Sequence, residues 1–177
     1  MQWRPKPNTV VLFKGSKNMS IQIGEQIPSA VLRILLDGSQ KEITSNEYFS
    51  GRKVALFSVP GAFTPTCSAK HLPGFVDHAE QLFAKGIDVI ACISVNDAFV
   101  MHAWGNSANA DKLDMLADGN GEFATALGLE LDLSVAGMGL RSKRFSLVAE
   151  DGVVTMLFVE APGEFRLSSA EHLLANL

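Results

Sequence analysis

Short runs of apolar residues, separated by turn residues, predict strands that alternate with helices along most of the chain. Apolar runs at 31–36, 53–59, 88–95 and 113–117 predict strands. The run at 88–95 is almost continuously apolar, which is typical of a strand covered on both faces of a parallel sheet. Residues 145–149 and 153–159 flank a tight turn at Glu150-Asp151-Gly152 and predict a hairpin.

Helices are predicted between these strands. Thr44 or Ser45 caps a short helix through residue 49, and Asp97 caps another through residue 105. A longer helix is expected over 67–85, kinked at Pro73 and ended by Gly86. Further helices are expected over 122–127 and, capped by Ser168 or Ser169, through residue 174.

This order of elements predicts an α/β fold in which a mixed central sheet lies between helical layers. The pattern is compatible with a thioredoxin-like architecture, although periodicity alone does not separate it from other α/β sandwiches. With 177 residues, one domain is expected over 20–177. Residues 1–19 have a different composition, with prolines and basic residues, and predict a loose N-terminal extension.

Composition excludes several classes of function. The formal net charge is −4, which disfavours nucleic-acid binding. No apolar run approaches the roughly 18 residues of a membrane-spanning helix. Two cysteines, Cys67 and Cys92, cannot form a disulfide framework, and no apolar leader is seen, so a reducing, cytoplasmic location is expected. Cys67 and His71 resemble a metal-ligand pair, but the remaining histidines and Cys92 have unhelpful spacing, and no metal is expected.

Cys67 lies where a buried strand has ended and a helix is predicted to begin. The free backbone N–H groups and the positive end of the helix dipole both favour a thiolate there. The preceding loop is stiffened by Pro60 and Pro65, which suits a site that holds atoms in place. We therefore interpret Cys67 as a reactive thiolate rather than a small buried apolar residue.

The residues around Cys67 exclude several classes of cysteine enzyme. A cysteine phosphatase would need an arginine where the chain has Pro73, and a Cys-x-x-Cys reductase would need a cysteine where it has Lys70. A papain-like protease carries a different sequence around its cysteine. A thiol peroxidase, which needs one cysteine, one hydroxyl and one guanidinium, remains.

The sequence around Cys67, together with several other segments, resembles that of a known family. The segment Pro60-Gly61-Ala62-Phe63-Thr64-Pro65-Thr66-Cys67 is similar to the Pro-x-x-x-Thr-x-x-Cys motif of peroxiredoxins. The blocks at 94–100, 117–123 and 143–146, with Trp104, resemble the type-5 subfamily, called type II in plants. The resemblance covers about residues 20–177.

The resemblance implies roles for four residues and no cofactor. Cys67 would be the peroxidatic thiolate, which attacks a hydroperoxide and becomes a sulfenic acid. Thr64 would orient the peroxide, Arg144 would place permanent positive charge beside the sulfur, and Pro60 would shield the thiolate from water. Without the resemblance, Arg141 and Lys143 would be as eligible as Arg144.

Reduction of that sulfenic acid is expected to come from outside the chain. Cys92 lies within a predicted core strand, and no cysteine is present near the C-terminus. Glutathione, with or without glutaredoxin, is the first choice of reductant and thioredoxin the second. His71 either tunes the thiolate, hydrogen-bonds a carbonyl or simply packs in the core.

Two other functions stay open, a thiol-based redox sensor or chaperone module without significant turnover and a glutathione-dependent transferase. The resemblance also implies a homodimer that pairs through loops around the active site. The apolar Phe99, Leu72 and Phe75 are its candidate contacts.

Overall fold

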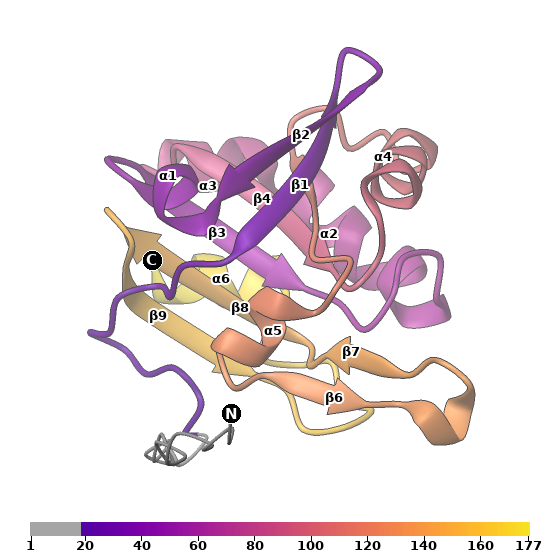
Figure 1. Cartoon of the computed structure of the whole chain (residues 1–177). Helices are drawn as coiled ribbons and strands as arrows, with labels where there is room; N and C mark the ends of the chain where they lie inside the picture. Colours follow the sequence, from indigo (N-terminus) through magenta and orange to yellow (C-terminus); the bar gives the residue numbers. More distant parts are fainter. Residues whose placement is uncertain (1–18) are drawn as a thin grey trace, which may run out of the picture.

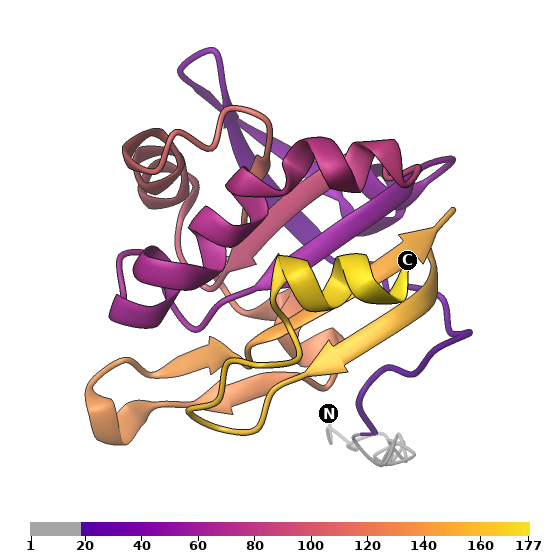
Figure 2. The same ribbon diagram turned by 180° about the vertical axis from the view of Figure 1, so that it is seen from behind.

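The computed structural model describes residues 19–177, which form a seven-stranded mixed sheet with helices on both faces (Figures 1 and 2). The predicted extension at 1–19 therefore lies, except for Met19, outside the described residues. The strands are β1 (Val31–Leu36), β2 (Ser39–Thr44), β3 (Lys53–Ser58), β4 (Val89–Ser94), β5 (Asp114–Ala117), β6 (Glu130–Asp132), β7 (Leu140–Ser142), β8 (Phe145–Glu150) and β9 (Val153–Val159). The helices are α1 (Ser45–Phe49), the π-helix η1 (Cys67–His71), α2 (Leu72–Asp77), α3 (Ala79–Ala84), α4 (Ala98–Ser107), α5 (Glu122–Ala126), the 3₁₀-helix η2 (Ser134–Ala136) and α6 (Ala170–Asn176).

The order of the strands places β3 and β4 at the centre of the sheet. The order is β2-β1-β5-β4-β3-β8-β9, in which β3, β4 and β5 are parallel and the outer pairs are antiparallel. The strands β6 and β7 form a separate two-stranded sheet. Because β3 is covered on both faces, five of its six residues are buried, as its apolar sequence predicts.

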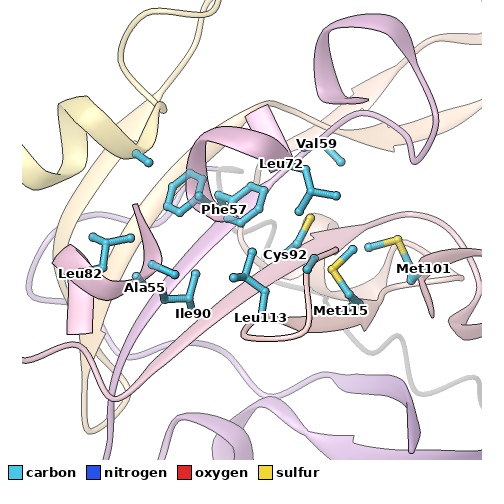
Figure 3. Close-up of a cluster of buried hydrophobic side chains, with 14 of the residues drawn as sticks. Ala55, Phe57, Val59, Leu72, Leu82, Ile90, Cys92, Met101, Leu113 and Met115 are labelled. Atoms are coloured by element: carbon cyan, nitrogen blue, oxygen red, sulfur yellow. The ribbon is translucent and has the colours of Figure 1, made fainter. Parts of the chain in front are cut away.

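Two apolar cores cover the two faces of the sheet. One contains the side chains of α2, α3, α4 and α6 that pack on β3 and β4, and Figure 3 shows part of it. The other contains residues of α1 and α5 and the opposite side chains of the same strands. In Figure 2, α2, α3 and α6 lie on the near face, whereas α1 and α5 lie in front of the sheet in Figure 1.

Three strands of the structure were not expected from the pattern. The strand β2 is an edge strand, and four of its six residues are exposed and polar, so its sequence carries no apolar alternation. The turn before it was predicted, and Asp37 and Gly38 both have positive φ, as a tight hairpin turn requires. The strands β6 and β7 have three residues each and are too short to give a periodic signal.

The prediction of one helix over 67–85, kinked at Pro73, is wrong in detail. The segment is divided into η1, α2 and α3, and the interruption between the two α-helices is at His78. Pro73 lies in the first turn of α2, where its missing N–H is tolerated. Of the two proposed caps for the last helix, Ser169 holds the position, and its hydroxyl accepts from His172 N.

Within residues 19–177, the structure has no helix long and apolar enough to cross a membrane.

Candidate active site

The loop between β3 and η1 is held in place at both ends. The amide of Ala62 donates to Oδ1 of Asn96, which follows β4, at 3.0 Å. Thr64 O accepts from Ser68 N at 3.0 Å and so begins the helical turn that contains Cys67. Phe63 has a φ of 63°, a conformation that bulky residues rarely adopt, and its ring packs on Trp104. These contacts fix the loop that carries Thr64 relative to the helix that carries Cys67.

The hydroxyl of Thr64 contacts the sulfur of Cys67. Thr64 Oγ1 lies 2.9 Å from Cys67 Sγ and 2.7 Å from the carbonyl of Gly61. A hydroxyl has one proton, so the two bonds cannot both be donated at once. With a thiol at Cys67, the S–H donates to Oγ1 and the hydroxyl donates to Gly61. With a thiolate, the hydroxyl turns to donate to the sulfur.

A guanidinium from a distant part of the chain contacts the same sulfur. Arg144 directly precedes β8, the neighbour of β3, and its Nη2 donates to Cys67 Sγ at 3.2 Å. Arg141 is held elsewhere, because its Nε donates to Met138 O and its Nη1 to Val95 O. Of the two arginines in this basic segment, Arg144 is therefore the one that reaches the sulfur.

His71 lies between Arg144 and Ser168, which precedes α6, and its side chain is fully buried among aromatic rings. Arg144 Nη1 donates to His71 Nδ1 at 2.9 Å, and because an arginine can only donate, Nδ1 must be the unprotonated nitrogen. The proton is then on Nε2, which donates to the carbonyl of Ser168 at 2.9 Å. Burial and the neighbouring charge of Arg144 lower the pKa of His71 to about 3. Of the roles expected for His71, the structure shows the hydrogen bond to a carbonyl and adds the contact with Arg144.

Pro60 lines a cavity beside these groups. The cavity has a volume of about 370 Å³, and Thr66 and Arg144 also contribute to its wall. The rest of the lining is mostly apolar, from Leu131, Leu133, Val159, Ala161 and Pro162, with Lys143, Glu160 and Glu164 as its other charged members. Cys67 is buried and is not among the lining residues, but its chain neighbour Thr66 and its hydrogen-bond partner Arg144 both border the cavity.

The comparisons with known proteins place the chain in a family. The Redoxin family model matches residues 22–174. The chain is a peroxiredoxin of the Redoxin family. It is 52% identical to peroxiredoxin-2E-2, chloroplastic, of rice over 89% of this chain and 73% of that protein. It is 48% identical to peroxiredoxin-2B of Arabidopsis thaliana over 89% of this chain and 98% of that protein.

A solved structure gives the same result for the fold. Reduced Prx3 of Vibrio vulnificus, in complex with H₂O₂, has a TM-score of 0.86 and 52% sequence identity, covering 88% of this chain and 98% of that one. The predicted thioredoxin-like fold and the resemblance to type-5 peroxiredoxins are thereby confirmed. This peroxiredoxin is a thiol-dependent peroxidase with an antioxidant function, as the sequence motifs indicate.

The second cysteine of the peroxiredoxin lies in the core. Cys92 is fully buried on β4, among the apolar side chains that Figure 3 labels. Burial raises the pKa of its thiol well above the usual value, so it stays protonated. Neither cysteine forms a disulfide.

Among the described residues, no cluster of three or more histidine, cysteine or carboxylate side chains could hold a metal ion. His71, the nearest such group to Cys67 along the helix, is already engaged at both ring nitrogens.

The sequence analysis missed one charged residue of this region. Glu160 follows the apolar strand β9 and is only 4% exposed, and its carboxylate binds the chain that carries Ser168. A lone carboxylate at the end of an apolar strand resembles an ordinary surface position. Only the pairing of this strand with β8, which begins next to Arg144, brings it to the site.

Proposed function

We propose that Cys67 is the peroxidatic residue and that Thr64 and Arg144 stabilise the charge that moves during its reaction. The observation that carries the proposal is their convergence on one sulfur, with Thr64 Oγ1 at 2.9 Å and Arg144 Nη2 at 3.2 Å. A charged donor and a hydroxyl, both directed at a buried sulfur, favour its thiolate.

The proposed reaction is a displacement at oxygen. The thiolate of Cys67 attacks the terminal oxygen of ROOH, an S–O bond forms, and the O–O bond breaks. The products are the sulfenic acid of Cys67 and RO⁻, which takes a proton from solvent to become ROH. Arg144, which does not titrate near neutral pH, keeps its positive charge beside both the sulfur and the departing oxygen.

Pro60 and the cavity that it lines suit the organic part of the substrate. A cavity of about 370 Å³ with mostly apolar walls has the size and character of a small-molecule site. We infer that hydrogen peroxide and small alkyl hydroperoxides are both accepted. Pro60 contributes to the wall that keeps bulk water from the sulfur.

We propose an external thiol as the reductant, with glutathione or glutaredoxin first and thioredoxin second. The support is the burial of Cys92, whose thiol is enclosed in the core and stays protonated. A thiol R′SH would attack the sulfenic acid to give a mixed disulfide and water, and a second thiol would then release Cys67. Such a cycle needs a reducing compartment, which is the basis for proposing a cytoplasmic location.

We also propose a homodimer, with a change in its contacts. Leu72 and Phe75 are fully buried in the core and cannot serve as contacts, so that part of the prediction is wrong. Both side chains of α2 belong to the apolar core on one face of the sheet, and the ring of Phe75 stacks on Phe57 of β3. The candidate contacts are therefore Phe99 on α4, which is 60% exposed, and Phe63 in the active-site loop, which is 56% exposed. Sedimentation at micromolar concentration tests the pairing, and a 19.0 kDa species alone would exclude it.

The decisive experiment for the function is peroxide consumption by the wild type and by Cys67→Ser, in parallel assays with glutathione, glutaredoxin and thioredoxin systems. We expect turnover with at least one system and none for the variant, because a serine hydroxyl is not ionised at neutral pH. Comparable turnover by both proteins would overturn the proposal. A wild type that is oxidised once but never reduced would favour the redox sensor instead.

A further inference from the structure

Glu160 is a buried carboxylate whose hydrogen bonds all come from one short segment. Its Oε1 accepts from the amides of Arg166, Leu167 and Ser168 at 2.7, 2.6 and 2.8 Å, and from the hydroxyl of Ser168 at 3.0 Å. Burial by itself would raise the pKa of Glu160, but these hydrogen bonds outweigh it and lower the pKa. The carboxylate is therefore ionised, and it holds residues 166–168 in one conformation.

The segment held by Glu160 contacts the catalytic arginine through His71. The carbonyl of Ser168 accepts from His71 Nε2 at 2.9 Å, and His71 Nδ1 accepts from Arg144 Nη1 at the same distance. The other guanidinium nitrogen, Nη2, donates to Cys67 Sγ at 3.2 Å. A continuous series of hydrogen bonds thus joins the carboxylate of Glu160 to the reactive sulfur.

Two further contacts tie the same elements together. The backbone amide of Glu160 donates to the carbonyl of Arg144 at 2.9 Å. The ring of Phe165, in the segment that Glu160 closes, lies 4.9 Å from the ring of His71 and 5.7 Å from Cζ of Arg144. Glu160 therefore fixes both the backbone of Arg144 and the groups that surround its guanidinium.

We propose that Glu160 is a positioning residue for peroxide reduction, which acts through the carbonyl of Ser168 and the ring of His71 on the orientation of Arg144. This inference rests on the proposed roles of Cys67 and Arg144. A direct effect of the charge of Glu160 would have the opposite sign, because a second negative charge near Cys67 disfavours its thiolate. Position and charge can therefore be separated by experiment.

Two variants separate them. Glu160→Gln keeps the length of the side chain and its accepting oxygen but removes the charge. Glu160→Asp keeps the charge but withdraws the oxygens by one methylene from the three amides. We expect the single-turnover rate with hydrogen peroxide to stay within about threefold for Glu160→Gln. For Glu160→Asp we expect it to fall about tenfold or more, with the midpoint of its pH profile moved upward, because displacements near 1 Å at a reacting group cost up to about 100-fold.

Asp118 supplies the matched control. It is another buried carboxylate, 3% exposed, and it accepts from the amides of Phe123 and Ala124 at 3.0 and 2.9 Å without contact to Arg144. Asp118→Glu also changes the length of a buried carboxylate side chain by one methylene, here by lengthening it, and is expected to reduce stability without changing the rate or the pH midpoint. Equal slowing by Asp118→Glu would show general loosening of the fold and overturn the positioning role. A Glu160→Gln variant as slow as Glu160→Asp, or two variants as fast as the wild type, would also overturn it.

An Arg144→Lys background shows which proposal has failed. If Glu160 acts through Arg144, then Glu160→Asp should slow the Arg144→Lys protein by no more than about twofold, since contacts in one network are not additive. If it slows that protein as much as the wild type, Glu160 acts by another route. If Arg144→Lys alone is as fast as the wild type, the proposed role of Arg144 fails. If Arg144→Lys is slow and Glu160→Asp is not, only the inference about Glu160 fails.

Discussion

Arg144 uses one guanidinium nitrogen to contact His71 Nδ1 at 2.9 Å and the other to contact Cys67 Sγ at 3.2 Å. The first contact requires a neutral histidine, because a protonated ring would present a hydrogen to the arginine. Burial and Arg144 lower the pKa of His71 to about 3, so the ring stays neutral through the physiological range. The site therefore combines one permanent cation with one histidine that is prevented from becoming a second.

This relationship predicts that the stability of the fold depends on pH through His71. Its pKa is about 3 in the folded protein and 6.5 when the ring is unperturbed, so the unfolded chain binds more protons between these values. The stability that the neutral ring of His71 contributes to the fold is fully present above pH 6.5 and is lost as the pH falls toward 3. The free energy of unfolding should decrease by about 2 kcal/mol between pH 7 and pH 5, a slope of about 1.4 kcal/mol per pH unit below 6.5.

Urea unfolding at the two pH values measures this difference for the wild type and for His71→Gln. The variant cannot titrate there and should lose most of the slope. The exposed histidine of α4 provides the control, since His102→Gln should keep the slope of the wild type. An unchanged slope in His71→Gln would contradict the prediction.

Thr64 allows a second prediction, on the hydroxyl that contacts the sulfur. Thr64→Val keeps the shape of the side chain and removes the donor, so the rate with hydrogen peroxide should fall about 100-fold or more. Thr64→Ser keeps the donor and should retain most of the rate. Stopped-flow peroxide consumption measures both.

The matched control for Thr64 is Thr155→Val on β9. The hydroxyl of Thr155 donates to the backbone carbonyl of Val148 at 3.2 Å and not to Cys67. The Thr155→Val protein should keep the rate of the wild type. A Thr64→Val protein as fast as Thr155→Val would remove Thr64 from the proposed machinery.

How far the sequence predicts this site depends on the distance over which each signal acts. The position of Cys67 at the start of the helix that follows a buried strand and the tight turns at Asp37-Gly38 and Asp151-Gly152 are local features, and each is visible in a few residues. The strand β2 was missed because its polar residues lie at the edge of the sheet, where burial imposes no pattern.

The partners of Cys67 were harder to predict, since they come from distant parts of the chain. Arg144 could be chosen over Arg141 only through the family resemblance, because both are arginines in one short segment. The roles of His71 and Glu160 depend on the packing of α6 and β9 beside η1, and no local pattern encodes that packing.

Cys92 gives a third prediction, which concerns reduction of the enzyme. Its side chain is fully buried and its neighbours across the sheet are Phe57 and Met115. Cys92→Ser should keep peroxidase activity with an external thiol but lose about 1–3 kcal/mol of stability, because a buried hydroxyl without a partner is costly. Cys92→Ala provides the comparison without the added hydroxyl.

Mass spectrometry after peroxide treatment without reductant completes this test. Cys67 should gain one and then two oxygens, as a sulfenic and then a sulfinic acid, while Cys92 stays unmodified. A dominant peptide with Cys67 joined to Cys92 would contradict the prediction and show that the helix carrying Cys67 unwinds during turnover.

The last prediction uses Trp104 as a reporter of the state of Cys67. Its indole Nε1 donates to Ser68 Oγ at 3.0 Å, and Ser68 is the residue next to Cys67. Trp104 is 1% exposed, so its emission depends on this contact and on the ring of Phe63 rather than on solvent. Because the sulfur is buried, we expect the addition of oxygen to displace the first turn of η1, and with it Ser68.

Because the chain has two tryptophans, a Trp3→Phe background isolates the emission of Trp104. One equivalent of hydrogen peroxide should change its intensity at the rate at which Cys67 is oxidised. The change should be absent in Cys67→Ser and smaller in Ser68→Ala, which lacks the hydrogen bond that joins the indole to the helix. A change of equal size in Cys67→Ser would show that peroxide acts on the indole itself, and no change in the Trp3→Phe protein would show that oxidation leaves the first turn of η1 in place.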